Sequence, residues 1–230
     1  MGSSARGLER WAWTGGVVFV AALLAESAVS VGFKVSQDDS AAKIADSLDR
    51  HHGRLILVFC LCIVYVVGFV VYLARLDDLL RRSTGSRRFF GSWVLVGGVL
   101  FVALHGVSDV GIYGLLAGKV AAYSAQHEPG LSYTLYLLTY ALDSVGDVFA
   151  SFFMLATGLL VLTTRVLPRW LGWIAVATGP FFLLQGFGLG GVVSSFGLVL
   201  DLIGFLLFLI FVLVSSVILL TRGGTAASGA

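Results

Sequence analysis

Apolar residues are arranged along this chain in long runs, separated by short polar segments. A helix that crosses a bilayer needs about 20 mainly apolar residues. Applied to this sequence, that length predicts six spans, at residues 11–32, 55–74, 92–118, 131–163, 170–189 and 192–220. The fourth is longer than a bilayer requires, so we expect it to tilt or to project beyond the membrane. The pattern therefore predicts an all-α, polytopic membrane protein with one six-helix transmembrane domain over residues 11–221.

Composition supports the same class. Hydrophobic residues make up 58% of the 230 positions and charged residues only 12%, whereas a soluble domain carries about 25% charged residues. The lipid bilayer is therefore an expected partner. The net charge is +2 and no basic cluster is interleaved with aromatic residues, so we expect no nucleic-acid partner.

The basic residues predict the orientation. Loops on the cytoplasmic side are enriched in Lys and Arg, and ten of these residues fall inside against five outside when both termini are cytoplasmic. The predicted inner set is Arg6, Arg10, Arg75, Arg81, Arg82, Arg87, Arg88, Arg165, Arg169 and Arg222. The predicted outer set is Lys34, Lys43, Arg50, Arg54 and Lys119. Residues 1–10 and 222–230 are then a cytoplasmic N-terminus and a cytoplasmic tail.

Two octets within the apolar runs resemble each other. The first octet is LHGVSDVG, residues 104–111, and the second octet is LDSVGDVF, residues 142–149. Residues four apart lie on one face of a helix, so each octet presents an ionisable pair. Because the third and fourth spans are antiparallel neighbours, we expect the octets to meet at one level. Small residues would allow the two backbones to approach closely there. They are Gly106, Ser108, Ser144 and Gly146.

Ionisable side chains inside the spans are the candidate functional residues. Each costs about 2.5–3.5 kcal/mol at the centre of a membrane helix, so an ionisable residue in a span indicates a functional role. Together with one amide they are Glu26, His105, Asp109, Asp143, Asp147, Gln185 and Asp201. Counted from the predicted cytoplasmic ends at about 1.5 Å per residue, all of them fall in the outer half of the membrane. The sequence thus predicts an outward-facing pocket that is acidic and contains one histidine. Asp143 and Asp201 lie near enough to the outer surface to contact headgroups or water instead.

The first functional hypothesis is proton- or cation-coupled transport of a small solute. No Lys or Arg lies within the predicted spans, so carboxyl groups that His105 does not match must bind protons or a cation. Asp109 and Asp147 would be the central coupling groups, with His105 and Glu26 as their partners. Candidate substrate contacts are Gln185, Asp201, Tyr136 and Tyr140. An aromatic belt at the membrane surface accounts for the two tyrosines equally well.

Two further hypotheses stay open at this point. A membrane-embedded enzyme would act on a lipid or isoprenoid through a carboxylic acid, or through a divalent metal ion such as zinc, iron or manganese. The candidate metal ligands are His105, Asp109, Asp143 and Asp147. In a structural or interaction protein, the same side chains would instead join helices by hydrogen bonds worth about 0.6–2 kcal/mol each. The sequence names neither a substrate nor an oligomeric state, and a homo-oligomer is one of the states it allows.

A family resemblance enters at LTTRVLPRWLGWIAVATGP, residues 162–180. The chain resembles a large group of uncharacterised bacterial multi-pass proteins that share a Leu-Pro-Arg-Trp-Leu-Gly segment between late spans. The segment occupies residues 167–172 here, and a histidine near the start of the second span is matched by His51 or His52. The resemblance implies a layout of about six spans and a bacterial plasma-membrane location. It implies no activity.

Overall fold

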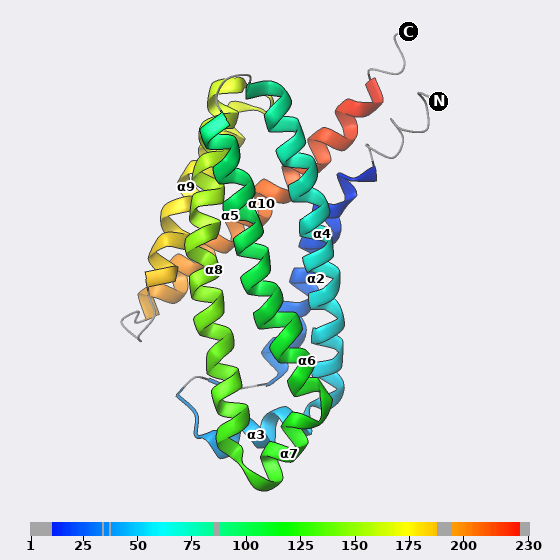
Figure 1. Cartoon of the computed structure of the whole chain (residues 1–230), viewed down its shortest axis with the longest axis vertical. Coiled ribbons are helices and arrows are strands. Elements are labelled where there is room, and N and C mark those ends of the chain that lie inside the picture. The colour runs from blue at the N-terminus through cyan, green and yellow to red at the C-terminus, as the bar shows by residue number, and fades with distance from the viewer. Residues whose placement is uncertain (1–10, 34, 37, 85–87, 188–194, 226–230) are drawn as a thin grey trace.

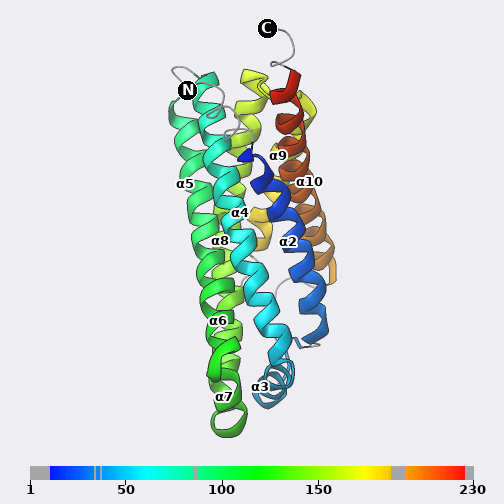
Figure 2. The same ribbon diagram turned by 90° about the vertical axis from the view of Figure 1, so that its right-hand side faces the viewer.

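The computed structural model describes residues 11–33, 35–36, 38–84, 88–187 and 195–225, and every regular element in these ranges is a helix. The longer helices form an elongated bundle (Figure 1). They are α2 (Thr14–Ser30), α4 (His52–Thr84), α5 (Arg88–His105), α8 (Pro129–Thr164), α9 (Arg169–Phe187) and α10 (Ser195–Thr225). The start of α2 and the end of α10 lie at the same end of the bundle in both ribbon views (Figures 1 and 2).

Five helices in the described part of the chain are long and apolar enough to cross a membrane. They are Thr14–Phe33, His52–Ser83, Phe89–His127, Pro129–Thr164 and Leu202–Thr221. This finding confirms the all-α, polytopic membrane class. Helix α9, which covers most of the fifth predicted span, is not among the five, although it packs against α8 and α10. Six crossings with both termini cytoplasmic therefore stay a prediction, as do the span boundaries.

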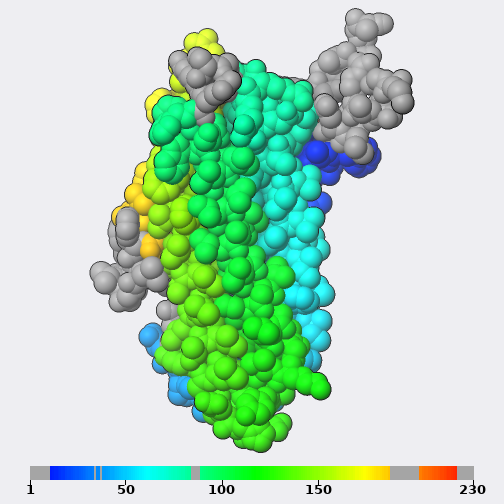
Figure 3. Space-filling model, viewed as in Figure 1, coloured from blue at the N-terminus to red at the C-terminus, as the bar shows by residue number. Residues whose placement is uncertain are grey.

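The outer surface of the bundle carries the apolar side chains that a bilayer requires. Helices α4, α5 and α8 lie side by side on the face shown in Figure 3. Val67, Val96 and Phe152, one from each of these helices, are exposed to between 38% and 56% of their surface. Apolar side chains that point outward on adjacent helices are typical of contact with lipid tails.

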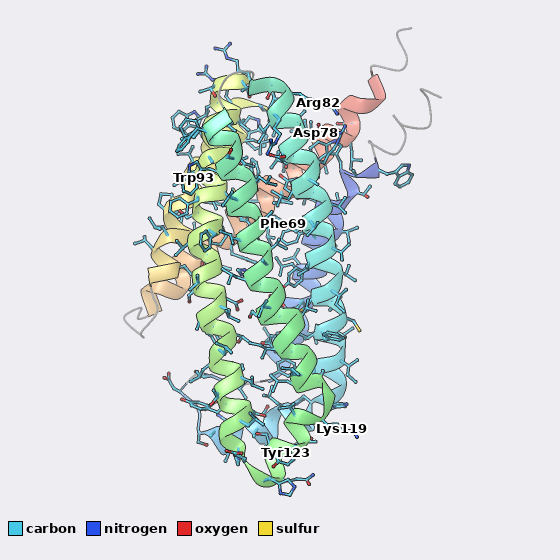
Figure 4. All side chains as sticks on the ribbon, viewed as in Figure 1. Phe69, Asp78, Arg82, Trp93, Lys119 and Tyr123 are labelled. Carbon is cyan, nitrogen blue, oxygen red and sulfur yellow. The ribbon has the colours of Figure 1, made fainter. Side chains whose placement is uncertain are left out.

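Helix α4 shows how an apolar run and a helix differ in length. The predicted span was 55–74, but the helix continues to Thr84 through the polar sequence RLDDLLRRST. Ion pairs four residues apart stabilise this extension, with 2.7 Å between Arg81 Nε and Asp77 Oδ2 and 2.9 Å between Arg82 Nε and Asp78 Oδ1. Asp78 and Arg82 lie at one end of the bundle (Figure 4). At about 1.5 Å per residue α4 is roughly 50 Å long, which exceeds the ~30 Å hydrocarbon core.

The third predicted span, 92–118, is not one regular α-helix. After α5 the chain forms a π-helical stretch, η2 (Gly106–Ile112), a short α6 (Tyr113–Leu115) and a second π-helical stretch, η3 (Leu116–Val120). Helix α7 (Ala121–His127) completes the run. Most of the first octet lies in η2. Single π-helical turns inside α-helices are frequent at functional sites.

Two short helices, α3 and α7, lie at the opposite end of the bundle from the start of α2 (Figure 1). Ser40 caps the start of helix α3 (Ala41–Arg50), and its Oγ accepts a hydrogen bond from the Lys43 N–H at 3.3 Å. Its buried face includes Ser47, which donates to the Phe33 carbonyl oxygen at 2.6 Å. Just before this helix, the Lys43 ammonium and the Ser36 N–H lower the pKa of Asp39 below its ordinary value. These contacts fix the segment that joins α2 to α4.

A layer of phenylalanine rings crosses the centre of the bundle. Each long helix contributes one buried ring to what we call the phenylalanine layer: Phe19, Phe69, Phe101, Phe153, Phe182 and Phe208. Ring centroids lie 5.1 Å apart between Phe19 and Phe69, 5.2 Å between Phe69 and Phe101, and 5.4 Å between Phe182 and Phe208. Aromatic pairs at these separations stabilise a core by about 0.5–1.5 kcal/mol each. Phe69 marks the level of the layer in Figure 4.

Candidate functional site: an acidic cavity

A cavity of about 520 Å³ lies directly beside the phenylalanine layer. Five ionisable side chains from three parts of the chain line it: Glu26, His105, Asp109, Asp143 and Asp147. Gln185, from α9, lines it as well. None of the described residues that line the cavity is a Lys or an Arg. The cavity therefore gathers carboxyl groups with a single histidine as their basic neighbour.

His105 is oriented by its own helix. Its Nδ1 lies 3.1 Å from the Phe101 carbonyl oxygen, so the Nδ1–H donates to that oxygen. The ring also packs on Phe101, with 4.4 Å between the ring centroids. This arrangement leaves Nε2 to face the second octet. Nε2 lies 3.9 Å from Asp143 Oδ1 and 3.9 Å from Asp147 Oδ1, which is too long for a direct hydrogen bond but short enough for an ion pair when the histidine is protonated.

Gly146 makes room for the histidine ring. A Cβ atom at this position would lie 2.6 Å from both Cε1 and Nδ1 of His105. Any larger residue would therefore overlap the ring. Gly106, by contrast, faces α4, with Val66 as its nearest neighbour at 4.0 Å. Of the small residues expected to allow the octets to meet, Gly146 contacts His105 directly and Gly106 does not.

Asp109, unlike His105, is positioned by a residue of a neighbouring helix, α4. The Tyr65 hydroxyl, on α4, donates a hydrogen bond to Asp109 Oδ2. Ser108 Oγ lies 3.4 Å from Asp109 Oδ1 and 3.3 Å from the Thr139 carbonyl oxygen on α8. Asp109 is thus positioned mainly through α4, although it also lines the cavity.

The two carboxyl groups of the second octet differ in exposure. The Asp147 side chain is 7% exposed and the Asp143 side chain is 33% exposed. Within the described residues, Asp143 Oδ1 is buried without a hydrogen-bond partner, and so is Gln185 Oε1. Buried acceptors that lack a partner cost about 1–3 kcal/mol each. Both atoms belong to side chains that line the cavity, where a bound donor would satisfy them.

Glu26 completes the ionisable lining from α2. Ser30, one turn further along the same helix, donates a hydrogen bond from its hydroxyl to Glu26 Oε1. The Glu26 side chain is half-buried and lines the same cavity as the residues of both octets. Three separate helical segments therefore contribute acids to one space.

The candidate substrate contacts are placed as follows. Gln185 and Tyr140 line the cavity. Tyr136 does not line it, but its hydroxyl lies 2.8 Å from the hydroxyl of Tyr140, which does. Asp201 falls in α10, and its side chain lies outside the described residues.

The arrangement also bears on the candidate metal site. In the described part of the chain, no group of three or more His, Cys, Asp or Glu side chains is spaced to hold a metal ion. His105, Asp109, Asp143 and Asp147 all line the cavity, with 3.9 Å from His105 Nε2 to an oxygen of Asp143 and to one of Asp147. A metal ion would require these side chains to rearrange.

Sequence reasoning named Tyr140 but missed other residues with hydroxyl groups that line the cavity. Tyr65 lies in the second span, which the sequence marked only by its lack of charge. Tyr113 and Thr139 also line the cavity, from α6 and α8. A tyrosine in the middle of an otherwise apolar span needs a partner for its hydroxyl. That requirement was the available signal for Tyr65.

Comparison with known families identifies the group to which this fold belongs. A family model described as a domain of unknown function, DUF4386, matches residues 17–223. The chain belongs to the DUF4386 family. The resemblance to an uncharacterised family is thereby confirmed, whereas the shared Leu-Pro-Arg-Trp-Leu-Gly segment and the bacterial plasma-membrane location stay predictions. No curated protein and no solved structure matches this DUF4386 protein.

Proposed function

We propose that this integral membrane protein exchanges protons for a small solute across the membrane, and that the carboxyl groups of the cavity are the coupling site. One observation carries the proposal. His105 Nε2 lies 3.9 Å from carboxyl oxygens of both Asp143 and Asp147, inside a cavity that Glu26 and Asp109 also line. A group of acids with one titratable base can bind and release protons as its occupancy changes.

Electrostatics gives the physical reason for coupling. Several carboxylates cannot all stay charged in a space of low dielectric constant without a matching cation. Because no Lys or Arg is among the described lining residues, protons or a positively charged ligand must supply the balance. Binding of either one then changes the affinity for the other, which is the thermodynamic definition of coupling.

The phenylalanine layer supplies a barrier beside this site. Phe101 lies one turn before His105 in α5, and Phe153 lies after Asp147 in the antiparallel α8. Both residues therefore lie nearer than His105 and Asp147 to the end of the bundle where α2 begins, and Phe101 borders the cavity from that side. With the predicted orientation, this end is cytoplasmic. A solute that enters the cavity from outside would cross only after the layer separates, as alternating access requires.

The test is solute-driven proton exchange in inside-out membrane vesicles. Respiration would acidify the vesicle lumen, a fluorescent pH probe would report the gradient, and cationic, neutral and anionic solutes would be added in turn. We expect at least one class to dissipate the gradient in vesicles that contain the protein. Asp147→Asn should slow this exchange by about 100-fold or more, as expected for the loss of a proton-transferring group.

Asp38→Asn is the matched control, because it makes the same chemical change at an exposed loop position. It should leave exchange unchanged, and Asp147→Glu, which keeps the carboxyl group, should retain part of it. If no class of solute dissipates the gradient with folded protein present, the proposal is wrong. If Asp147→Asn lowers thermal stability but leaves exchange intact, the carboxyl group has a packing role instead.

A further inference from the structure

The walls of the cavity combine acids with aromatic rings. Tyr65, Phe101, Tyr113, Tyr140, Phe182 and Phe205 line it alongside the carboxyl groups. From this lining we infer that the transported solute is an organic ammonium ion, with N–H donors at one end and an apolar body at the other. The inference rests on the proposed transport function and names the substrate class of the same site.

The polar atoms of the cavity require a ligand that donates hydrogen bonds. Asp143 Oδ1 and Gln185 Oε1 are buried acceptors without a partner among the described residues. An ammonium group carries donors and a positive charge, so it would satisfy these atoms and offset the carboxylates at once. An anionic ligand would meet like charges with no Lys or Arg in the described lining to bind it.

The aromatic rings suit the rest of such a ligand. A cation within about 6 Å of an aromatic ring centre is attracted to the face of the ring. Phe101 borders the ring of His105, with 4.4 Å between their centroids, so an aromatic wall adjoins the ionisable cluster. The remaining rings provide apolar surface for a hydrocarbon body. The cavity volume of about 520 Å³ lies within the ~300–1,000 Å³ of pockets that enclose small organic ligands.

Exchange of this ligand for protons balances charge. When the ammonium ion enters, a carboxyl O–H in the cavity releases its proton to solvent, and the carboxylate that remains neutralises the ligand. The net charge of the occupied cavity then equals that of the protonated empty cavity. Proton release on binding is therefore a direct consequence of this ligand class, and an uncharged ligand would not require it.

Calorimetric titration of the purified full chain in detergent tests the inference. The probes are phenethylammonium, the neutral phenethyl alcohol and the anionic hydrocinnamate, which share an aromatic body and differ in charge. We expect phenethylammonium to bind about tenfold more tightly than the alcohol or better, as one charge-assisted hydrogen bond would give. Titrations in buffers with different heats of ionisation should also show that protons are released.

Asp143→Asn should reduce this preference for the ammonium ion, whereas Asp38→Asn should preserve it. Equal binding of the ammonium ion and the alcohol, or tighter binding of hydrocinnamate, would overturn the inference. The proposed function fails separately. If a neutral solute drives proton exchange in vesicles while phenethylammonium does not bind, coupling stands and the substrate class is wrong. If phenethylammonium binds but no solute moves protons, the binding site stands and coupling is wrong.

Discussion

The two octets share Leu, Val, Asp and Val at matching positions, yet their backbones differ. The second octet lies within α8, a continuous α-helix, whereas most of the first octet lies in the π-helical η2. Their aspartates also differ in surroundings. Asp109 accepts a hydrogen bond from Tyr65 of α4, while Asp147 lies 3.9 Å from the histidine of the other octet. Similar sequence has therefore produced two different parts of one cavity lining.

This difference shows what each octet contributes. The first octet contributes His105, whose ring is oriented by the Phe101 carbonyl one turn earlier in α5. It also contributes Asp109, which accepts a hydrogen bond from Tyr65 of α4. The second supplies two carboxyl groups and, at Gly146, the space for the histidine ring. Because the octets are complementary rather than equivalent, the same substitution should have unequal effects in the two.

Of the paired substitutions, Gly146→Ala and Gly106→Ala should differ most in their effects on stability and exchange. In Gly146→Ala the added Cβ would lie 2.6 Å from the His105 ring, and such overpacking costs about 1–3 kcal/mol. Up to about 1 kcal/mol returns from better helix propensity, so we expect net destabilisation of roughly 1–2 kcal/mol. Reversible unfolding in mixed detergent micelles would measure it. Vesicle exchange should fall as well, because the ring must move.

Gly106→Ala is the matched substitution in the first octet. Its nearest neighbour would be Val66 at 4.0 Å, an ordinary contact, so we expect neither destabilisation nor loss of exchange. Equal effects of the two alanines would contradict the description of Gly146 as the space for His105.

Removal of the Tyr65 hydroxyl should have a smaller effect. Tyr65→Phe deletes the donor to Asp109 and should cost about 1 kcal/mol of stability, the usual net value of such a bond. Exchange should weaken without vanishing, since the carboxyl group itself remains. Tyr72→Phe serves as a comparison, because its hydroxyl lies 2.8 Å from Ser215 Oγ and not in the cavity lining. Tyr72→Phe should leave exchange unchanged. If it slowed exchange as much as Tyr65→Phe does, the effect of Tyr65→Phe could not be attributed to the lost hydrogen bond to Asp109.

Much of the fold followed from the hydrophobic pattern, because lipid imposes a minimum apolar length on any crossing helix. That pattern could not give the true length of α4, whose polar extension depends on ion pairs rather than on hydropathy. It also could not reveal the π-helical turns near Gly106, which leave the apolar content of the third span unchanged. A period of apolar residues reports burial and not the register of backbone hydrogen bonds.

The sequence predicted those residues of the candidate site that have ionisable carboxyl or imidazole groups. The high cost of ionisable groups in a membrane singled out Glu26, His105, Asp109 and Asp147, and the structure brings these four side chains into one cavity. Their roles stay predictions. Tyr65 was not identified, because the sequence shows that its hydroxyl needs a partner but not that the partner is Asp109. Phe69 and the rest of the phenylalanine layer were indistinguishable from ordinary apolar positions.

The most direct test of the central claim, that the octets form one shared site, is a double-variant comparison in the vesicle assay. Asp109→Asn, Asp147→Asn and the double variant would be measured beside the wild type, with stability monitored in parallel. One shared site predicts that each single substitution abolishes exchange and that the double variant loses nothing more. If each single variant keeps about half the exchange and only the double variant abolishes it, the octets act independently and the account is contradicted.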